Sequence, residues 1–261
     1  MAPEIRTLEG SAFASAPLVA AKAGRTISVL IPSRDEERTV GAVVRAVREP
    51  HVLDAGGSGL VDEVVVIDDG SSDATAAAAR SAGARVVRLA TGGGKGQAMR
   101  AGLEASFGDL VVFLDADVEN TTPTFVCGLV GPLLVHDDVT LVKGFYRRPL
   151  YGAPSGGGRV TELVARPLIE LCFPELAGVR QPLAGETAAP RWVLEKVQFA
   201  NGYGVELGLL IDVARRFGVG SLAQVDLGVR IHRNRPLDQL RPQAVDVLRS
   251  ALDRLEPGSP T

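Results

Sequence analysis

The sequence predicts an α/β fold of the Rossmann-like type, in which helices cover both faces of a mainly parallel sheet. Two observations support this prediction. Apolar strands alternate with helical stretches through the first half of the chain, and a cluster of polar residues follows each of four strands. Parallel sheets bind ligands at the carboxyl ends of their strands, so these clusters are the candidate functional positions.

The first half of the chain repeats one order of elements. Residues 26–31, TISVLI, are β-branched and apolar, and valines recur at helical spacing within residues 36–49. The elements expected after them are a strand from residue 62, a helix from about residue 74, a strand over residues 84–89, a helix opened by the glycines of residues 92–96, and a strand over residues 109–117.

The second half is less regular. Helices are expected over residues 123–135, 160–172, 203–217 and 237–254, and strands over residues 139–145 and 221–231. Residues 1–24 are Ala-rich and mixed in charge, which predicts a flexible N-terminal arm. Residues 25–255 are expected to form a single domain with two halves, 25–120 and 121–255.

Composition narrows the class of protein. The 261 residues are 46% hydrophobic and 23% charged, which is ordinary for a globular protein, and the formal net charge is -3. That charge argues against a general nucleic-acid binder. The two cysteines, Cys127 and Cys172, suggest neither a disulfide framework nor a metal knuckle, so a cytoplasmic location is expected. No apolar run approaches the roughly 18 residues of a membrane helix.

The strand DLVVFLDAD ends in two carboxylates, Asp115 and Asp117, separated by Ala116. If the chain stays extended, both side chains face the same way and can converge on one hard cation. Mg²⁺ favours such oxygen ligands together with substrate phosphates. An isolated D-x-D is more often a solvated strand end, but the apolar strand before it favours a metal site.

Two further clusters are suited to a nucleotide. Asp69, in the turn Asp68–Ser71, is placed to accept hydrogen bonds from a base or ribose, and Ser71 or Ser72 is placed to cap the next helix. Glycines 92–96 let the backbone approach a ligand, and Lys95 supplies a charge for a phosphate or carboxylate. The spacing is not that of a P-loop, and a flexible loop with an exposed lysine is an equally good alternative.

Two positions in the second half complete the candidates. Gly156–Gly158 precede an expected helix, so Arg159, Thr161 and free backbone N–H groups form a candidate anion site. The alternative is a glycine hinge beside a surface arginine. His232 follows an apolar strand, and a lone histidine is usually structural, but with Asp117 present it is a candidate metal ligand.

The ordered motifs IPSRDEE, VIDDGSSD, GGKGQAMRAGL and LVVFLDAD resemble those of the GT-A glycosyltransferases, which use nucleotide-diphosphate sugars. The later motifs VKGFYRRP, GGGRVTEL, QPLAGE, GYGVELGLLID and HRNRPL resemble those of the glucosyl-3-phosphoglycerate synthases, retaining enzymes of actinobacteria. The resemblance covers roughly residues 26–240. It implies that residues 25–120 bind the nucleotide sugar and residues 121–255 bind the acceptor.

The resemblance implies transfer of glucose from UDP-glucose to the 2-hydroxyl of 3-phosphoglycerate, with Mg²⁺ or alternatively Mn²⁺, in a homodimer that engages neither membrane nor nucleic acid. The residues it implies for donor binding are Pro32, Ser33, Arg34, Glu36, Asp69, Ser71, Lys95, Asp115, Ala116, Leu183, Gly185, Tyr203 and Glu206. Those implied for the acceptor are Gly158, Arg159, Thr161 and Asn234. Asp117 and His232 would bind the metal, and Asp117, Glu206 and Lys95 would act in catalysis.

Charge development suggests the mechanism. Breaking the sugar–phosphate bond places negative charge on the departing diphosphate, which a metal and Lys95 can stabilise. Retention by front-face attack needs no protein nucleophile, and a covalent role for Glu206 is the weaker hypothesis. Arg34 stands where the family pattern I-P-A-L-N-E-E has an apolar residue, so the preferred base is left open.

Three alternatives to this function stay open. The nearest is a mannosyl-3-phosphoglycerate synthase that uses GDP-mannose. A polyprenyl-phosphate sugar transferase is more distant, because no anchor or basic amphipathic helix is visible. A non-catalytic nucleotide-sugar-binding protein is the third. A nicotinamide dehydrogenase is disfavoured, because the first strand lacks G-x-G-x-x-G at its turn.

Overall fold

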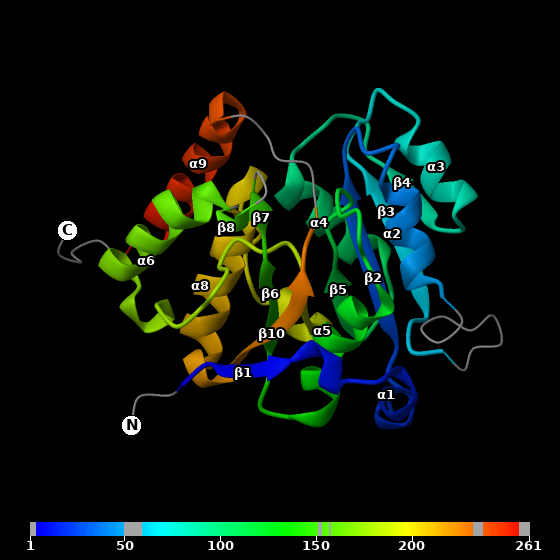
Figure 1. Ribbon diagram of the computed structural model, residues 1–261, viewed down its shortest axis with the longest axis horizontal. Coiled ribbons are helices and arrows are strands. Elements are labelled where there is room, and N and C mark those ends of the chain that lie inside the picture. Colours follow the sequence, from blue (N-terminus) through cyan, green and yellow to red (C-terminus); the bar gives the residue numbers. More distant parts are fainter. Residues whose placement is uncertain (1–3, 50–58, 151–152, 157, 232–236, 256–261) are drawn as a thin grey trace.

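The computed structural model describes residues 4–49, 59–150, 153–156, 158–231 and 237–255. Its centre is an eight-stranded sheet in the order β1-β10-β6-β9-β5-β2-β3-β4 (Figure 1). The bounds of its strands are Arg6–Glu9 for β1, Ile27–Ser33 for β2, Glu63–Asp68 for β3, Arg85–Arg88 for β4, Leu110–Phe113 for β5, Leu141–Arg147 for β6, Thr187–Pro190 for β9 and Leu222–Val229 for β10.

The sheet is mainly parallel, as the apolar strands predict. β9 is the exception among the eight strands of this sheet, because it pairs antiparallel with both β5 and β6. Strands β2, β3 and β5 are buried along nearly their whole length, since helices cover both faces. The α/β fold class is therefore confirmed.

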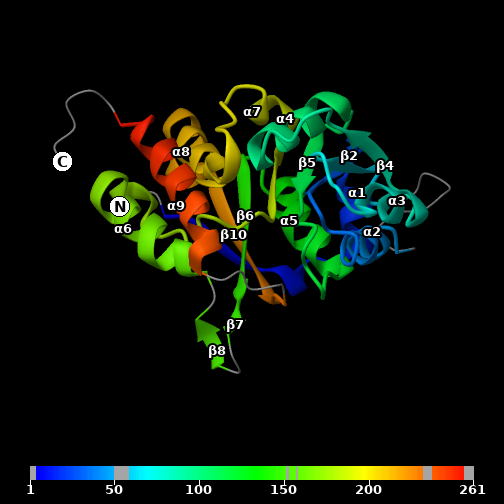
Figure 2. The same cartoon turned by 90° about the horizontal axis from the view of Figure 1, so that it is seen from above.

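One face of the sheet packs against α1, α2, α3 and α5, and the other against α4, α6, α8 and α9. The helices are α1 Ser15–Ala21, α2 Val40–Val47, α3 Thr75–Ser81, α4 Lys95–Ala105, α5 Pro123–Val135, α6 Arg166–Cys172, α7 Arg191–Leu194, α8 Val205–Phe217 and α9 Leu237–Leu252. A π-helical turn, Thr161–Ala165, leads into α6. From above, helices α6, α8 and α9 lie together at one end of the sheet and α2 and α3 at the other (Figure 2).

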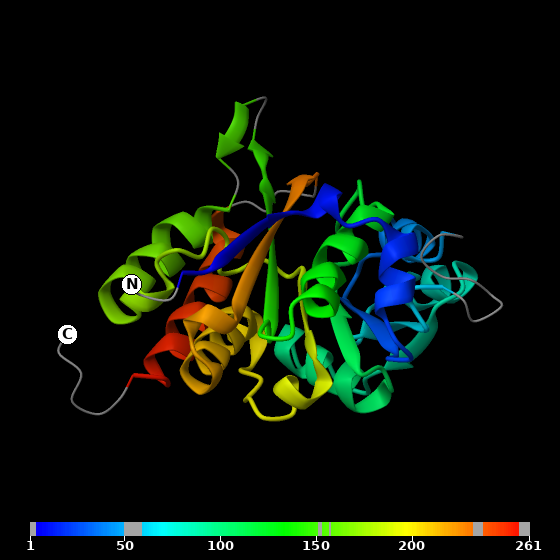
Figure 3. The same cartoon turned by 90° about the horizontal axis from the view of Figure 1, so that it is seen from below.

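A small hairpin of β7 (Pro149–Leu150) and β8 (Ala153–Gly156) projects from the body of the molecule (Figures 2 and 3). It leads into the turn that begins at Thr161. Among the described residues, no helix combines the length and the apolar character that crossing a bilayer requires.

The expected flexible arm over residues 1–24 is wrong for its larger part. Arg6–Glu9 form β1, which pairs in parallel with β10 from Arg6–Ala223 to Glu9–Asp226. Ser15–Ala21 form α1, whose Leu18 is buried. Such a short strand with charged residues at both ends carries little apolar signal, and pairing with a strand more than 200 residues away determines its structure.

Candidate active site

The glycine-rich loop is held by Asp69. The backbone N–H groups of Gly93 and Gly94 donate to Asp69 Oδ1 and Oδ2 over 2.8 and 2.9 Å. Gly94 has φ of +84°, a conformation that favours glycine, and α4 begins at the next residue, Lys95. Both carboxylate oxygens of Asp69 thus fix the loop that starts α4, which supports the ligand pocket from behind.

Lys95 is brought between two carboxylates. Its Nζ lies 2.5 Å from Asp115 Oδ1 and 2.5 Å from Glu206 Oε1. Burial alone would lower the pKa of Lys95, but the charges of Asp115 and Glu206 outweigh burial and raise that pKa well above its usual value. Lys95 is therefore a fixed positive charge at neutral pH.

Arg230, directly after β10, bridges the two aspartates. Its Nη2 lies 2.8 Å from Asp115 Oδ2 and 2.7 Å from Asp117 Oδ1. Burial alone would raise the pKa of Asp115, but Lys95 and Arg230 hold that pKa far below its usual value. Asp115 is therefore ionised throughout the physiological range, and its two oxygens are occupied by two different cations.

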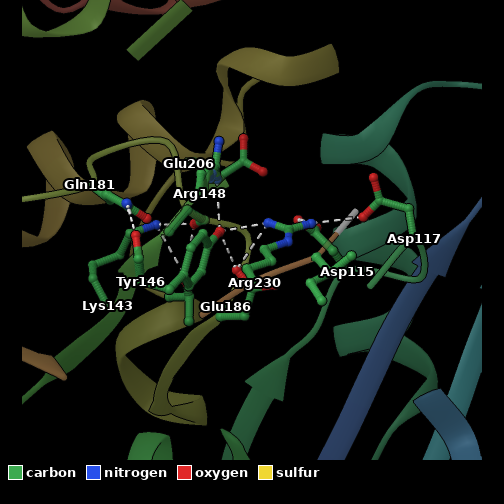
Figure 4. Close-up of polar contacts among 12 residues, drawn as sticks. Asp115, Asp117, Lys143, Tyr146, Arg148, Gln181, Glu186, Glu206 and Arg230 are labelled. Atoms are coloured by element: carbon green, nitrogen blue, oxygen red, sulfur yellow. Dashed lines mark hydrogen bonds and ion pairs between the residues drawn. The ribbon is translucent and has the colours of Figure 1, made fainter. Parts of the chain in front are cut away.

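A buried polar network continues behind Arg230. Arg230 Nη1 donates to Tyr146 Oη over 2.5 Å and lies 3.4 Å from Glu186 Oε2, while Tyr146 Oη donates to Glu186 over 2.7 Å. Arg148 Nη2 donates to Tyr146 Oη over 2.7 Å. Burial raises the pKa of Tyr146 to about 12. Figure 4 shows this network running from Tyr146 and Glu186 through Arg230 to the aspartate pair.

Two cavities meet at these charges. One, of about 470 Å³, is lined by residues 32–36 after β2, by Asp69 and by residues 115–117. The other, of about 160 Å³, is lined by Arg148, residues 158–161, Leu183, Glu206 and Arg230. They share Lys95, Asp115, Asp117 and Tyr203. A larger groove of about 850 Å³ between α4 and α9 has none of the expected site residues in its described lining, so the converging charges, not cavity size, locate the site.

The structure brings most of the expected residues to these cavities. Around the larger cavity lie Pro32, Ser33, Arg34, Glu36, Asp69, Lys95, Asp115, Ala116, Asp117 and Tyr203. Around the smaller lie Gly158, Arg159, Thr161, Leu183, Glu206 and, again, Lys95, Asp115, Asp117 and Tyr203. His232 and Asn234 lie outside the described residues.

Two expected donor residues stand behind the cavities. Ser71 is buried: its N–H donates to Asp68 Oδ1 over 2.8 Å, and its Oγ accepts from the N–H of Asp35 over 3.0 Å. Gly185 packs on Asp115, where an added Cβ would collide with the carboxylate. Neither Ser71 nor Ser72 caps α3, because that helix has no side-chain cap. Instead, Ser72 bonds Asp35 and the two serines tie the loops after β2 and β3 together.

The carboxylate oxygens of the site suit a divalent metal ion, and one of the carboxylates can be reached from both cavities. Asp117 supplies a hard carboxylate oxygen at the junction of both cavities, with its side chain 24% exposed. No three His, Cys, Asp or Glu side chains gather into a metal-binding group among the residues the structure describes. Mg²⁺ commonly uses one or two carboxylates plus substrate phosphates, so Asp117 can supply a protein ligand, while Asp115 beside it is held by Lys95 and Arg230.

Several side chains of the site were not expected from sequence. Tyr146 lies within β6, where a single aromatic residue usually indicates a core position. Arg230 directly follows β10, where a single arginine usually indicates only the end of the strand. Arg148 lines the smaller cavity, and its Nε is buried without a hydrogen-bond partner among the described residues. The paired arginines of FYRRP were the available signal for Arg148.

A mainly parallel sheet with two cavities that meet at a carboxylate pair and a lysine is the arrangement expected of a nucleotide-sugar glycosyltransferase. The comparisons agree with that class. A family model described as glycosyl transferase family 2 matches residues 28–154.

A more specific likeness covers most of the chain. The glucosyl-3-phosphoglycerate synthase of Mycolicibacterium paratuberculosis is 51% identical over 253 residues, which are 92% of this chain and 75% of that protein. At this identity and coverage, the chain belongs to the glucosyl-3-phosphoglycerate synthase family.

Solved structures give the same relationship. The Mycobacterium tuberculosis glucosyl-3-phosphoglycerate synthase in complex with Mn²⁺, UDP-glucose and phosphoglyceric acid matches with a TM-score of 0.89 and 46% identity, covering 99% of this chain and 90% of that one. The same enzyme with Mg²⁺ and UDP matches with a TM-score of 0.88 and 47% identity, covering 97% and 88%.

Proposed function

We propose that this chain transfers glucose from UDP-glucose to the 2-hydroxyl of 3-phosphoglycerate, with retention of configuration and a divalent metal. One observation carries the proposal: two cavities, one suited to a nucleotide and one to an anion, meet at Lys95, Asp115, Asp117 and Tyr203. A group transfer needs its two substrates side by side at one set of charges. The relative of known structure holds UDP-glucose and phosphoglyceric acid together.

The larger cavity takes the donor in this proposal. The Pro32–Glu36 segment and Asp69 line this cavity, and the base and ribose would lie against them, while Lys95 lies beside Asp115. Arg34 is 58% exposed in its side chain and lies 4.0 Å from Asp69. It adds hydrogen-bond donors at the edge of the proposed base position, and the comparison of UDP-glucose with GDP-glucose below tests which base they favour.

The smaller cavity takes the acceptor. Arg148 and Arg159 bring two positive charges to it, and Gly158 and Thr161 lie where the chain enters the π-helical turn. Two arginines suit an acceptor that carries both a phosphate and a carboxylate. Asn234 belongs to this set by the family pattern alone.

The reaction proceeds by charge stabilisation. The bond between the glucose anomeric carbon and the diphosphate breaks, and negative charge grows on the departing oxygen. Lys95 is fixed as a cation beside this position and stabilises that charge. The acceptor hydroxyl attacks from the face that the diphosphate leaves, and its proton passes to the departing phosphate oxygen.

Glu206 has a supporting role in this route. Its Oε1 is paired with Lys95 and its side chain is 4% exposed, so it orients Lys95 rather than attacking the sugar. Asp117, with His232 by the family pattern, would hold the metal, which supplies positive charge for the diphosphate when bound.

In the test, the purified protein is incubated with 3-phosphoglycerate, Mg²⁺ and one donor, either UDP-glucose, GDP-glucose or GDP-mannose. The product is identified by mass spectrometry. We expect a glucosylated phosphoglycerate that disappears with EDTA and in Asp117→Ala. A mannosylated product would favour the mannosyl alternative. Nucleotide-sugar binding without any product would favour a binding protein. Light scattering on the same sample tests the homodimer, which stays a prediction.

A further inference from the structure

Lys143 is a buried lysine that the proposed reaction leaves without a role. It lies on β6 and is 3% exposed. Its Nζ donates to the carbonyl oxygen of Ala184 and, over 3.0 Å, to Oγ1 of Thr187, and neither acceptor carries a charge. Removing an ammonium group from water costs free energy that two neutral acceptors only partly offset. The buried ammonium group therefore lowers the stability of the fold, which points to a role for Lys143 in the site.

The charges around Lys143 come from four elements. Glu206 on α8, Glu186 before β9 and Asp115 after β5 are acidic, and Lys95 on α4 is basic. Burial is the largest influence and lowers the pKa of Lys143 to about 8. The ammonium form still predominates at neutral pH, so both hydrogen bonds are made by a charged donor.

The backbone that Lys143 holds lies directly against the reacting charges. The segment Leu183–Glu186 leads into β9, and Leu183 lines the smaller cavity. Gly185 packs on Asp115 so closely that a Cβ on Gly185 would lie 2.5 Å from Asp115 Oδ2. A displacement of this segment would therefore change the space that Asp115 occupies.

Strand β6 fixes this segment at three points. Lys143 holds the carbonyl of Ala184. The N–H of Gly144 donates to the carbonyl of Glu186 over 2.8 Å, and Tyr146 Oη donates to the Glu186 carboxylate over 2.7 Å. Of these three contacts, that of Lys143 acts on Ala184, the residue that immediately precedes Gly185, and the Ala184 carbonyl also accepts from Thr187 Oγ1 over 3.4 Å. The Lys143 contact is also made by a side chain, so it can be removed without altering the backbone of β6.

We propose that Lys143 is a positioning residue for glycosyl transfer: by holding the carbonyl of Ala184, it sets the Leu183–Glu186 segment, and with it Asp115, against the reacting sugar. The inference rests on the proposed function. Lys143 acts through the segment and touches no substrate in this account. Its loss should therefore lower kcat and leave the KM of each substrate nearly unchanged.

The experiment compares Lys143→Met with Lys143→Gln. Methionine matches lysine as far as Cε and loses every N–H donor, whereas glutamine places an uncharged amide with two N–H donors one bond short of the lysine nitrogen. We expect Lys143→Met to lower kcat about 30- to 100-fold, as a shift near 1 Å in a reacting group does. We expect Lys143→Gln to recover kcat to within about 10-fold of wild type, because the hydrogen bond is restored.

Hydrogen exchange gives a readout that does not depend on turnover. Amides of residues 183–187 should exchange faster in Lys143→Met than in wild type, with protection restored in Lys143→Gln and the remaining sheet unchanged. If wild type transfers no glucose, the proposed function fails, and the exchange data still decide whether Lys143 holds the segment.

Three outcomes overturn the inference. One is a Lys143→Met protein with kcat within threefold of wild type. Another is a raised KM with unchanged kcat. The third is an equal loss of kcat in both variants with unchanged exchange at residues 183–187, which would assign the effect to charge alone. If Lys143→Met does not fold, Lys143→Gln decides: kcat above a tenth of wild type supports the inference, and a 100-fold loss with intact exchange overturns it.

Discussion

Gly185→Ala tests whether the place of Asp115 is set by direct packing. An alanine Cβ at this position would lie 2.5 Å from Asp115 Oδ2 and closer still to Oδ1 and Cγ, whereas ordinary contact begins at 3.4 Å. The carboxylate must therefore retreat by roughly 1 Å or more. It cannot retreat without stretching its ion pairs with Lys95 at 2.5 Å and Arg230 at 2.8 Å.

Two magnitudes follow for Gly185→Ala. Forcing a methyl group into a packed site should lower the free energy of unfolding by about 1–3 kcal/mol. Misplacing a charged group of the site by about 1 Å should lower the rate of glucosyl-phosphoglycerate formation about 100-fold. Urea unfolding and a product assay by mass spectrometry measure the two effects on the same preparation.

Gly178→Ala is the matched control. Among the residues that the structure describes, a Cβ there would meet only Ile5 Cδ1, at 3.5 Å, which is ordinary contact. It should leave the rate unchanged and leave stability equal or slightly higher, because alanine restricts the unfolded chain. A Gly185→Ala protein with a rate within threefold of wild type would refute the argument that packing on Gly185 fixes Asp115.

Three other predictions address the buried charges. Arg230→Met should lower the free energy of unfolding by about 3–5 kcal/mol, because buried carboxylates lose their partner. Arg100→Met, which removes an exposed ion pair with Glu104, should change the free energy of unfolding little. Equal urea midpoints for the two variants would contradict this prediction. Because burial lowers the pKa of Lys143 to about 8 from 10.5, the unfolded chain binds more protons between these values, so this residue adds stability as pH rises through that window. Unfolding curves at pH 8 and 10.5 should show a smaller rise in Lys143→Met than in wild type, and identical slopes would exclude the shift. Glu206→Gln should keep turnover within about 10-fold of wild type, since Glu206 orients Lys95; a loss of 1000-fold or more, with a trapped glycosyl-enzyme, would establish a covalent route instead.

The sequence predicted those helices and strands whose own residues favour that conformation, and it missed those that depend on distant partners. The apolar run from Pro123 to Val135 predicted α5 with the bounds that the structure has, since proline suits the first turn of a helix. β9 was missed, because Thr187–Pro190 is short, has no alternation and ends in proline. Its strand conformation comes from hydrogen bonds to β5 and β6, which lie far away in the sequence.

The site divides in the same way. Lys95 and Asp115 each follow a strand of one parallel sheet, so the topology alone predicts that they lie at one edge. Arg230 gave no such signal, because its partners lie more than 100 residues away and a lone arginine at a strand end usually reaches solvent. Lys143 could not be predicted either, because a lysine within an apolar strand is very rarely buried.

The parallel pairing of β1 with β10 has a consequence for the behaviour of the chain during synthesis. β10 offers one hydrogen-bonding edge to β6 and the other to β1, so β1 is what shields that edge from other chains. β1 begins and ends with charged residues, Arg6 and Glu9, as is typical of a strand at the edge of a sheet. Yet β1 is synthesised more than 200 residues before β10, so it has no partner until β10 has been made. A ribosome-bound chain stalled before residue 222 therefore has a β6 edge and a β1 strand both without partners, and this is the stage at which association with other chains competes with folding.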